Sequence, residues 1–466
     1  MAGAPQPAEP LGQIWTGAGC DPGALDDCVL SGEEPVLPSV FRVGTAARTV
    51  IAAQSLAAAE LWRERRDRRQ QVSVDMRRSA IAFCSEAFTR ILGRPAAGRW
   101  SAVSGYYRTR DGRWIQLHCQ YPHLRDGVLA VLDCEEDPHA VARAVSRWDG
   151  AALERACRDR ALCVALLRSP REWADHPQSR ALADLPLIEI ERIGDAPPRP
   201  LPQDGERPLS GIRVLDLTKV IAGPICGRTL ASHGAEVMRV GAAHLPVLEP
   251  LIIDTGLGKR STFVDLREQD GRRVLRELAS QADIFVQGYR PGTLEGRGFG
   301  PGEMAALRPG MVYVTLSAYG HAGPWRDWRG FDSLVQTASG IAWQGMEAAA
   351  AAQPLPLPCQ ALDHATGYLA AFGAMVALLN RARTGGSWMV RVSLAQTGRW
   401  IDRLGRVDGL SVSMPGEDDI ADMLEVHSSP WGDVLHVQTP QVMPDTPSCW
   451  ESGPVPPGTH PPVWAA

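Results

Sequence analysis

Residues 213–240 read RVLDLTKVIAGPICGRTLASHGAEVMRV, and their order predicts a strand, a tight turn and a helix. The run Arg213–Leu217 is short and β-rich, and Ala222-Gly223-Pro224 then turns the chain into a helical stretch. The same alternation returns, with strand candidates at Glu236–Val240, Asp283–Val286 and Met311–Ser317 and a helical stretch at Gly271–Ser280. Strands that alternate with helices are typical of a parallel sheet, so we expect a Rossmann-like α/β domain over about residues 208–340.

Two irregular segments divide the chain. Proline and charged residues cluster at Asp195–Pro208, a composition that cannot hold a helix or a central strand and therefore predicts a linker. At Glu347–Pro358 five alanines precede alternating proline and leucine, which favours an extended segment. We therefore expect three regions, residues 1–200, 201–410 and 411–466, of which the last is short and rich in proline.

The composition is that of a globular protein. Of the 466 residues 44% are hydrophobic and 22% are charged, and the net charge of −5 gives no whole-chain attraction to nucleic acid or an anionic membrane. The ten cysteines form no CxxC pair and no Cys/His run at metal spacing, so we expect neither disulfides nor a metal site. The apolar run Gly367–Leu379 is shorter than the about 20 residues of a bilayer span and predicts a buried helix. The N-terminus lacks a basic start followed by an apolar stretch, which predicts a cytoplasmic protein.

The sequence repeats itself weakly when residue 59 is laid on residue 377, an offset of 377 − 59 = 318. Six matches fall in one window, where Ala59, Leu61, Arg63, Arg65, Val72 and Val74 lie on Ala377, Leu379, Arg381, Arg383, Val390 and Val392. At this offset Asp363 falls on Thr45. The pattern favours an old duplication in which one copy kept a carboxylate, although two unrelated arginine-bearing helices followed by strands would give the same matches.

Asp363 stands where a long apolar helix is predicted to begin, in CQALDHATGYLAAFGAMVALL. Its ordinary role there would be an N-cap that accepts backbone N–H bonds. A helix N-terminus also favours the ionised carboxylate, which is the form that can attack a carbonyl carbon. Both roles stay open, and the neighbouring His364 is more often a packing or hydrogen-bonding residue than a base.

Several familiar catalytic motifs are absent from the sequence. There is no GxSxG elbow, no Walker loop and no complete GxGxxG fingerprint after the strand at Val214, which removes the usual support for a hydrolase, an NTPase or a dehydrogenase. Cations do occur at or near predicted turns of the α/β region, where loops can present charge to phosphate. They are Lys259, Arg260, Arg267, Arg290, Arg297 and Arg329, each of which singly would be a solvated surface charge.

A series of segments resembles the class III CoA-transferases, also called the CaiB/BaiF family. The segments are LSGIRVLDLTKVIAGPICGRTLASHGAEVMRV, GKRSTFVDLREQDGRRVL, ADIFVQGYRPGTLEGRGFG, LSAYGHAGPW, RGFDSLVQTASG and LDHATGYLAAFGAMVALLNRARTGGSWMVRVSL. They cover about residues 208–400 in the family's own order, a far more specific signal than any single short pattern. The resemblance implies a Rossmann-like large domain with a second, smaller α+β domain.

The resemblance also implies chemistry. In such enzymes the aspartate that opens the long helix attacks an acyl-CoA thioester, and Asp363 occupies that position. Coenzyme A would be the substrate and acyl carrier, a carboxylic acid the acceptor, and no metal would take part. The residues expected to hold CoA are Ile221, Ala222, Lys259, Arg267, Gly288, Tyr289, Arg290, Arg297 and Arg329. The chain departs from the family pattern at Gly288, where asparagine is common, at Arg297, which comes one place late, and at Gly241, which replaces a frequent glutamate.

Two other functions stay open. Racemases of the same fold pair an aspartate with a histidine in a GHD segment, which here reads Gly330-Phe331-Asp332. Phenylalanine cannot transfer a proton, so His321 or His364 would have to substitute in a rearranged site. The third function is that of a catalytically inactive CoA-binding subunit.

The first 200 residues resemble the family's later region, from the long helix through the smaller domain, in a degenerate form without the aspartate. YYRTRDGRWIQLHC, residues 106–119, is similar to the start of that smaller domain. Members of the family form interlocked dimers whose site lies between the large domain of one subunit and the small domain of the other. The resemblance therefore implies a homodimer.

Overall fold

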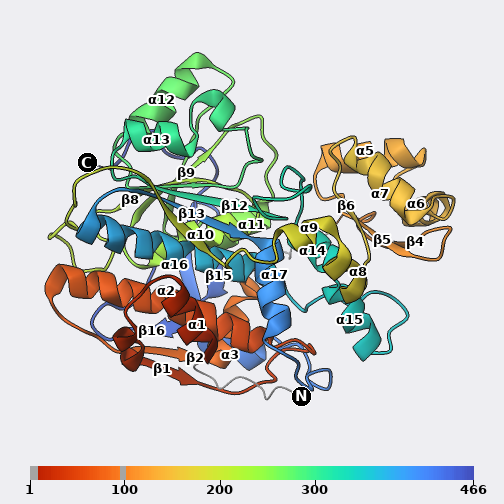
Figure 1. The fold of residues 1–466 in the computed structure, drawn as a ribbon, viewed down its shortest axis with the longest axis horizontal. Helices are drawn as coiled ribbons and strands as arrows, with labels where there is room; N and C mark the ends of the chain where they lie inside the picture. The colour runs from red at the N-terminus through yellow and green to blue at the C-terminus, as the bar shows by residue number, and fades with distance from the viewer. Residues whose placement is uncertain (1–8, 95–100, 466) are drawn as a thin grey trace.

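The computed structural model describes residues 9–94 and 101–465, which fold around a seven-stranded sheet (Figure 1). In spatial order the strands are β10 (Lys259–Phe263), β9 (Glu236–Gly241), β8 (Arg213–Leu217), β11 (Ile284–Gln287), β12 (Val312–Ser317), β13 (Ser387–Ser393) and β7 (Glu189–Gly194). The first six are parallel and, counted along the chain, lie in the order 3-2-1-4-5-6, which is the Rossmann order. The Rossmann-like fold expected from the sequence is confirmed.

The sheet is larger than the strand candidates of the sequence indicated. The four candidates became β8, β9, β11 and β12, each within one residue of its expected bounds. The sheet extends beyond residue 340 to β13, and its last strand, β7, comes from the N-terminal half and pairs antiparallel with β13. A distant segment can complete the sheet edge because the backbone N–H and C=O groups of β13 need partners.

Helices cover both faces of the sheet. They are α10 (Ala222–Ser232), α16 (Ala361–Thr384) and α2 (Val43–Arg66) on one face, and α12 (Gln269–Ala279) and α13 (Pro301–Leu307) on the other (Figure 1). Successive side chains of a strand point to opposite faces. Accordingly, Val214 belongs to the core that contains α10 and α16, whereas Leu215 packs in the core that contains α12 and α13.

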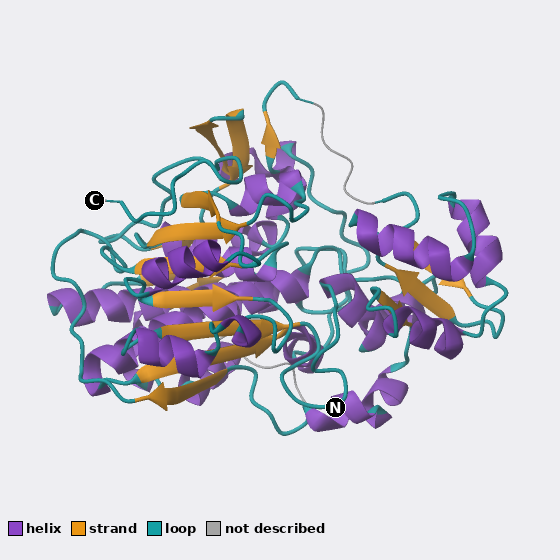
Figure 2. Cartoon of the chain, turned by 90° about the horizontal axis from the view of Figure 1, so that it is seen from above, coloured by secondary structure: helices purple, strands orange, loops and turns teal. Residues whose placement is uncertain are grey.

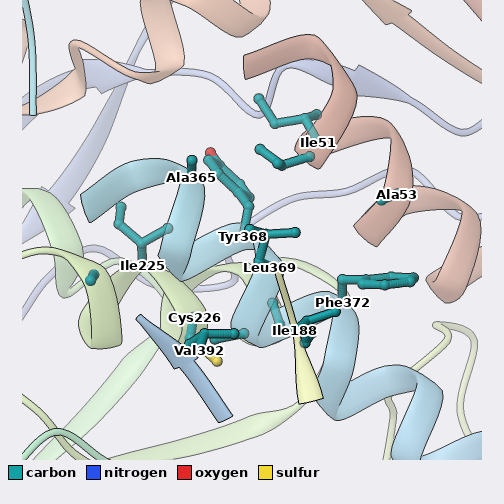
Figure 3. Close-up of a cluster of buried hydrophobic side chains, with 14 of the residues drawn as sticks. Ile51, Ala53, Ile188, Ile225, Cys226, Ala365, Tyr368, Leu369, Phe372 and Val392 are labelled. Carbon is teal, nitrogen blue, oxygen red and sulfur yellow. The ribbon is translucent and has the colours of Figure 1, made fainter. Parts of the chain in front are cut away.

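The central helix of the molecule is α16. Its Leu369 and Phe372 lie between Ile225 of α10, Ile188 ahead of β7 and Ile51 of α2 (Figure 3). By length and composition α16 could cross a membrane, but its most apolar stretch is wholly buried within the structure. The buried helix expected from Gly367–Leu379 is therefore confirmed.

The two long helices α2 and α16 are structural counterparts. Each has 24 residues, and their first residues, Val43 and Ala361, are separated by the same offset of 318 positions that appears in the sequence. After each helix comes a strand, β2 (Val72–Asp75) or β13, and then a helix, α3 (Met76–Ala82) or α17 (Leu394–Arg403). Helices α3 and α17 also begin at residues that this offset relates. The repeat in the structure supports the duplication inferred from the sequence.

A smaller α+β unit lies to one side of the sheet (Figures 1 and 2). It consists of the antiparallel strands β4 (Gly105–Arg108), β5 (Trp114–Leu117) and β6 (Val164–Leu166) with helices α5 (Pro122–Leu132), α6 (Pro138–Val145) and α7 (Gly150–Arg158). The unit has a hydrophobic core of its own, which includes Ile115, Val128 and Leu153. This is the second, smaller domain that the sequence predicted, and we call it the small unit.

The C-terminal segment is more regular than its proline content indicated. Strands β14 (Leu424–Ser429) and β15 (Gly432–Val437) form a hairpin that β3 (Arg90–Ile91) extends, and β16 (Gln441–Val442) pairs with β2 beside β1 (Cys28–Ser31). The chain around β16 thus packs on the first copy of the repeat, whereas Trp464 packs in the core beside α12. No helix or strand interrupts residues 195–212 or 349–360, as expected for irregular segments.

The remaining elements connect these parts. They are α1 (Glu9–Gly17), α4 (Ser85–Phe88), α8 (Pro170–Asp175), α9 (Pro177–Ala181), α11 (Glu249–Thr255), α14 (Asp332–Ala338) and α15 (Ile341–Ala348), with short 3₁₀ turns at Pro22–Asp27, Glu295–Arg297 and Asp418–Met423.

Candidate active site

A cavity of about 420 Å³ opens at the carboxyl ends of β8, β11 and β12. Its lining includes Leu217–Lys219 after β8, Gly288–Pro291 after β11, and Ser317 at the end of β12. Strand order reverses between β8 and β11, and in open α/β sheets ligands bind in the crevice beside that switch point. The fold alone therefore places a binding site here.

The small unit supplies the opposite wall of this cavity. Tyr121, His123 and Leu124 at the start of α5, together with Cys163 ahead of β6, line the same space as Asp363. Both walls therefore belong to the same chain. One comes from the large domain and the other from the small unit.

Specific contacts hold the small unit against the segment around α14. The rings of His118 and Phe331 stack with centroids 3.8 Å apart, and the guanidinium of Arg158 lies 4.7 Å from the ring centroid of Trp328. Further along α14, the hydroxyl of Thr337 lies 3.0 Å from that of Tyr106. These contacts fix the position of the small unit relative to the sheet and so define the width of the cavity.

Asp363 is the third residue of α16, and its side chain reaches this cavity. The N-cap position belongs to Gln360, so the interpretation of Asp363 as the helix N-cap is wrong. Within residues 9–94 and 101–465, no group donates a hydrogen bond to the Asp363 carboxylate. The Asp363 side chain lines the cavity, where the carboxylate is accessible to a ligand.

A second carboxyl group, Asp332 at the start of α14, takes over the capping role. Its Oδ2 accepts a hydrogen bond of 2.9 Å from the backbone N–H of Asp363, and its Oδ1 accepts another from the amide of Gln336. Complete burial raises the pKa of Asp332 to about 6. Asp332 therefore fixes the start of α16 from a neighbouring helix.

The electrostatic surroundings of Asp363 make its charge costly in the empty cavity. Burial, and after it the charges of Asp332 and Glu86, raise the pKa of Asp363 well above its usual range. A buried carboxylate without hydrogen-bond donors has a poorly solvated charge and is correspondingly reactive towards an electrophile.

His364 points away from the cavity. Its Nε2 lies 2.9 Å from the carboxylate of Glu86 on α4, and its ring stacks on Phe83 with centroids 5.5 Å apart. His321 also lies outside the cavity, with its Nε2 3.3 Å from the carbonyl oxygen of Val392. Neither histidine shares the cavity with Asp363.

Positive charge gathers on the cavity wall. Lys219, Arg290, Arg326 and Arg329 all line it, and among the residues that the structure describes Asp363 is the one acidic member of the lining. Burial, and then the charges of Arg329 and Lys219, lower the pKa of His123, and burial and Arg329 lower that of Arg290. Groups that mutually disfavour protonation indicate a positive potential, so the cavity is suited to an anionic ligand.

The residues expected to bind CoA divide into three groups. Ala222, Gly288, Tyr289, Arg290 and Arg329 line the main cavity. Arg267 and Arg297 line a hollow of about 110 Å³ that adjoins it, and Tyr289 is part of both linings. Ile221 is buried just before α10 and does not line either space, although Val220 beside it does line the main cavity.

Lys259 lies apart from these residues. Its ammonium group is buried, 2.7 Å from the carboxylate of Asp216 and 2.7 Å from the carbonyl oxygen of Pro224. Arg260 pairs with Glu236 at 3.3 Å. The charge of Lys259 is thus neutralised by Asp216 inside the large domain, and Lys259 does not line the cavity.

Sequence reasoning missed the contribution of the small unit. Tyr121, His123 and Cys163 carry no motif, and only the three-dimensional fold brings them to Asp363, which is 200 or more positions away. Lys219 was also missed, although it follows β8 directly and the position after a parallel strand is a signal for a binding residue. Val220 next to it has a φ of 70°, an unfavourable conformation for a β-branched residue that is characteristic of functional loops.

Comparisons with known proteins point to one family. The sequence profile of CoA-transferase family III matches residues 28–191 and 209–403, which lie on either side of the irregular segment and together cover most of the chain. Acetyl-coenzyme A transferase nodX of Hypoxylon pulicicidum is 28% identical over 70% of this chain and 58% of its own length. An acyl-CoA transferase of Gibberella moniliformis is 32% identical over 66% of this chain and 57% of its own length. The chain thus spans little more than half the length of these relatives.

Shorter matches agree with these two. Succinyl-CoA–D-citramalate CoA-transferase of Chloroflexus aurantiacus is 33% identical over 40% of this chain and 49% of its own length. Among solved structures, that of Rv3272 from M. tuberculosis is similar with 31% identity and a TM-score of 0.39, over 43% of this chain and 59% of that chain.

Proposed function

Because the chain belongs to CoA-transferase family III, we propose that it transfers coenzyme A from an acyl-CoA to a carboxylic acid. The observation that carries this proposal is the position of Asp363. Within residues 9–94 and 101–465 it is the one carboxylate on the wall of a cavity whose other charged residues are cations. A nucleophile for the thioester and a binding site for the phosphates of CoA are thereby combined in one space.

The proposed reaction uses Asp363 as a covalent carrier. A carboxylate oxygen of Asp363 attacks the thioester carbonyl carbon, the C–S bond breaks, and CoA leaves as a thiolate from a mixed anhydride. The thiolate then attacks the Asp363 carbonyl carbon, which releases the first acid as a carboxylate and leaves an aspartyl-CoA thioester. An incoming carboxylate attacks that thioester, and the thiolate finally attacks the new acyl carbon, which regenerates the Asp363 carboxylate.

Two features of the cavity support this sequence of steps. The first is the apolar part of the cavity lining, which includes Phe331, Leu394 and Leu124 and disfavours the water that would hydrolyse the anhydride or the thioester. The second is the raised pKa of Asp363, which reflects a carboxylate poorly stabilised before substrate arrives. If Asp363 were paired with a cation, the phosphates of CoA would compete for that cation on binding. Within the described residues Asp363 has no such partner, so CoA binding changes its surroundings less.

The cations suggest how CoA lies in the site. Arg290 and Arg329 both line the cavity and would hold the phosphates; burial, and after it the charge of Arg329, lowers the pKa of Arg290. The adjoining hollow with Arg267 and Arg297 would receive the adenosine end, with Tyr289 between the two spaces. In this arrangement the thioester end of the molecule would lie towards Asp363.

Mass spectrometry after incubation with acyl-CoA and hydroxylamine tests the proposal. The panel includes acetyl-CoA and succinyl-CoA, after which two relatives are named, and longer acyl groups. Hydroxylamine traps an activated carboxyl group as a hydroxamate, and we expect this product at residue 363 and none in Asp363→Ala. CoA binding without any adduct would instead support the inactive CoA-binding subunit.

A racemase is the second candidate, because one observation favours a proton-transfer partner for Asp363. His123 of the small unit lines the same cavity, whereas Phe331 stands at the family's histidine position and stacks on His118. Incubation of an α-branched acyl-CoA in deuterated water without acceptor acid separates the two functions. Deuterium at the α-carbon that disappears in His123→Ala would support the racemase, and its absence supports the transferase.

The assembly and location of the protein also stay proposals. The resemblance implies a homodimer, and the N-terminal sequence predicts a cytoplasmic location, yet one chain supplies both walls of the cavity. We therefore propose that dimerisation is not required to complete this site. Light scattering combined with activity measured across a dilution series tests this, since a site shared between chains would lose specific activity on dilution.

A further inference from the structure

The hairpin of β14 and β15 places three potential metal ligands on one face. Glu425 and His427 lie two residues apart on β14, and His436 on β15 is the direct cross-strand partner of Glu425. Nδ1 of His427 lies 2.7 Å from Nε2 of His436, which in turn lies 3.7 Å from the Glu425 carboxylate. The three ligand atoms all lie within 4.8 Å of one another.

Backbone carbonyl groups determine the tautomer of each histidine. Nε2 of His427 lies 3.1 Å from the carbonyl oxygen of Trp450, and Nδ1 of His436 lies 3.0 Å from that of Val437. A carbonyl oxygen only accepts, so both of these ring nitrogens carry a hydrogen. The two nitrogens that face each other at 2.7 Å are therefore the ones with lone pairs.

Two lone pairs at this distance repel unless a positive charge lies between them. A shared proton would meet the requirement, but it would make one ring an imidazolium. His436 is completely buried, so this charge would be costly. A metal ion uses both lone pairs and is neutralised in part by the Glu425 carboxylate, which is partly exposed and gives the ion a path from solvent.

We propose that Glu425, His427 and His436 form a binding site for a divalent transition-metal ion of the zinc type. Two imidazole nitrogens and a carboxylate are a donor set that zinc accepts, with a fourth position left for water. At zinc–nitrogen distances of about 2.0–2.1 Å in a tetrahedral site the two nitrogens are about 3.3 Å apart, so the rings need to separate by less than about 1 Å. The carbonyl acceptors on the outer ring nitrogens provide the orienting contacts that metal-bound histidines usually have.

The site lies outside the cavity of Asp363 and serves another purpose. Trp450, whose carbonyl contacts His427, donates its indole N–H to the carbonyl oxygen of Arg228 on α10, at 3.0 Å. Arg228 forms a buried ion pair of 2.9 Å with Asp254, which also binds Ser85 on α4. All three ligands lie on the hairpin, so a metal ion would stabilise the hairpin itself, which Trp450 connects to the large domain.

Spacing explains why the sequence did not indicate this site. His427 and His436 are nine residues apart, and no cysteine accompanies them, so they match no zinc motif. The site arises from cross-strand pairing, which brings residues of two strands together at a separation that depends on the turn.

Metal binding is tested with the full chain, stripped with chelator and titrated with Co²⁺ and Zn²⁺. Visible absorption of Co²⁺, competition of Zn²⁺ with a chromophoric chelator, and thermal unfolding are the readouts, and none depends on enzymatic activity. We expect one ion per chain and a higher melting temperature with Zn²⁺. His427→Gln should abolish binding and Glu425→Gln should weaken it by at least about tenfold.

His139→Ala is the matched control, because His139 is an exposed histidine on α6 far along the chain from the hairpin. It should bind the ion as the unchanged protein does. Binding that persists in His427→Gln, or that is lost equally in His139→Ala, would overturn the proposal. So would nitrogen NMR shifts showing that the pair keeps a shared proton at neutral pH in the presence of Zn²⁺.

Discussion

The backbone N–H groups of Thr45 and Asp363, which are 318 positions apart, make the same kind of hydrogen bond. That of Thr45 donates to the carboxylate of Glu34 at 2.7 Å, and that of Asp363 donates to the carboxylate of Asp332 at 2.9 Å. Both residues are third in a helix of 24 residues. The two copies thus retain the same helix start, with a carboxylate from elsewhere as its cap.

This equivalence shows that the geometry of the helix start does not depend on the presence of Asp363. A capped first turn and a long buried helix occur in both copies, so neither requires an aspartate at the third position. Only the second copy combines this turn with the cavity beside β8 and β11. The Thr45 position therefore offers an internal control for experiments on Asp363.

Replacement of Asp363 by alanine should reduce CoA transfer by at least about a thousandfold, because no other carboxylate of the described part of the chain lines the cavity to form the acyl intermediate. Transfer is measured by chromatography of acyl-CoA products. Thr45→Ala, the equivalent change in the other copy, should leave the rate within about twofold. Transfer that survives in Asp363→Ala would refute the covalent mechanism.

Asp332→Asn should shift the pH dependence of transfer. In the proposed mechanism Asp363 reacts as a carboxylate, so kcat/KM should fall at acidic pH as Asp363 becomes protonated. The charge of Asp332 contributes to the raised pKa of Asp363, so its removal should move this acidic fall to lower pH. Asp175→Asn, at an exposed position on α8, should leave the profile unchanged. An unaltered acidic limb in Asp332→Asn would show that the two carboxyl groups do not interact.

The same substitution makes a prediction for stability. Burial raises the pKa of Asp332 to about 6, above its value in the unfolded chain, so the folded state binds the proton more tightly. The resulting stabilisation is complete below about pH 4 and is lost as the pH rises through about 6. The quantity to compare is the free energy of unfolding of Asp332→Asn minus that of the unchanged protein. This difference should be about 1–3 kcal/mol more positive at pH 7 than at pH 4.5. Denaturant unfolding at both values measures it.

Arg290→Ala and Arg329→Ala should weaken the binding of acyl-CoA. Each removes a cation from the cavity wall, and a charged hydrogen bond to phosphate contributes about 1.5–3 kcal/mol, which corresponds to roughly 10–100-fold in KM. Steady-state kinetics at several salt concentrations provide the measurement. Arg273→Ala, on the exposed side of α12, is the control and should behave as the unchanged protein. If all three variants had the same KM, the phosphates of CoA would have to bind away from Arg290 and Arg329.

Lys259→Met should destabilise the protein without a specific effect on CoA. The change leaves Asp216 buried without its partner, which costs roughly 3–5 kcal/mol. Asp216→Asn in the same chain should recover part of that loss, because no unpaired charge then remains. Both are followed by thermal unfolding, with KM for acyl-CoA measured well below the melting temperature. A raised KM for acyl-CoA in the double variant would contradict this prediction and indicate that Lys259 takes part in CoA binding.

Gly367→Ala should disturb the contact of α16 with α10. A Cβ at this position would lie 2.5 Å from the carbonyl oxygen of Ala222 and 2.7 Å from Cβ of Ile225, so the helices would have to separate. We expect a loss of roughly 1–3 kcal/mol and a lower kcat, because Ala222 also lines the cavity. Gly302→Ala, where no atom lies within 4 Å, should be neutral or slightly stabilising. Comparable unfolding curves for the two variants would contradict the close contact.

Much of the large domain could be predicted from local sequence. The runs that became β8, β9, β11 and β12 are short, apolar and separated by helical stretches, and a strand buried on both faces needs such a run. β7 could not be found in this way, because Glu189–Gly194 is partly polar and becomes a strand only through the free edge of β13. The hairpin at 424–437 was concealed by the proline-rich composition around it.

The candidate site was predicted in part. Asp363, Arg290 and Arg329 follow from the family resemblance and all line the cavity. The expected N-cap role of Asp363 was wrong, since a cap can come from another helix and Asp332 lies 31 positions earlier. Lys259 carries the charge that the sequence indicated, but whether a lysine faces solvent or a buried carboxylate depends on packing.

The sequence by itself determined the parallel sheet, the buried central helix, the repeat at an offset of 318 and the nucleophile candidate Asp363. These depend on periodicity and on residue identity, which are local properties of the chain. Only the tertiary structure decided that His123 and Tyr121 complete the cavity, that Asp332 caps α16 and raises the pKa of Asp363, and that His427 faces His436. Each of these depends on distances and burial between segments that are remote in sequence, and these are set by the packing of the whole chain.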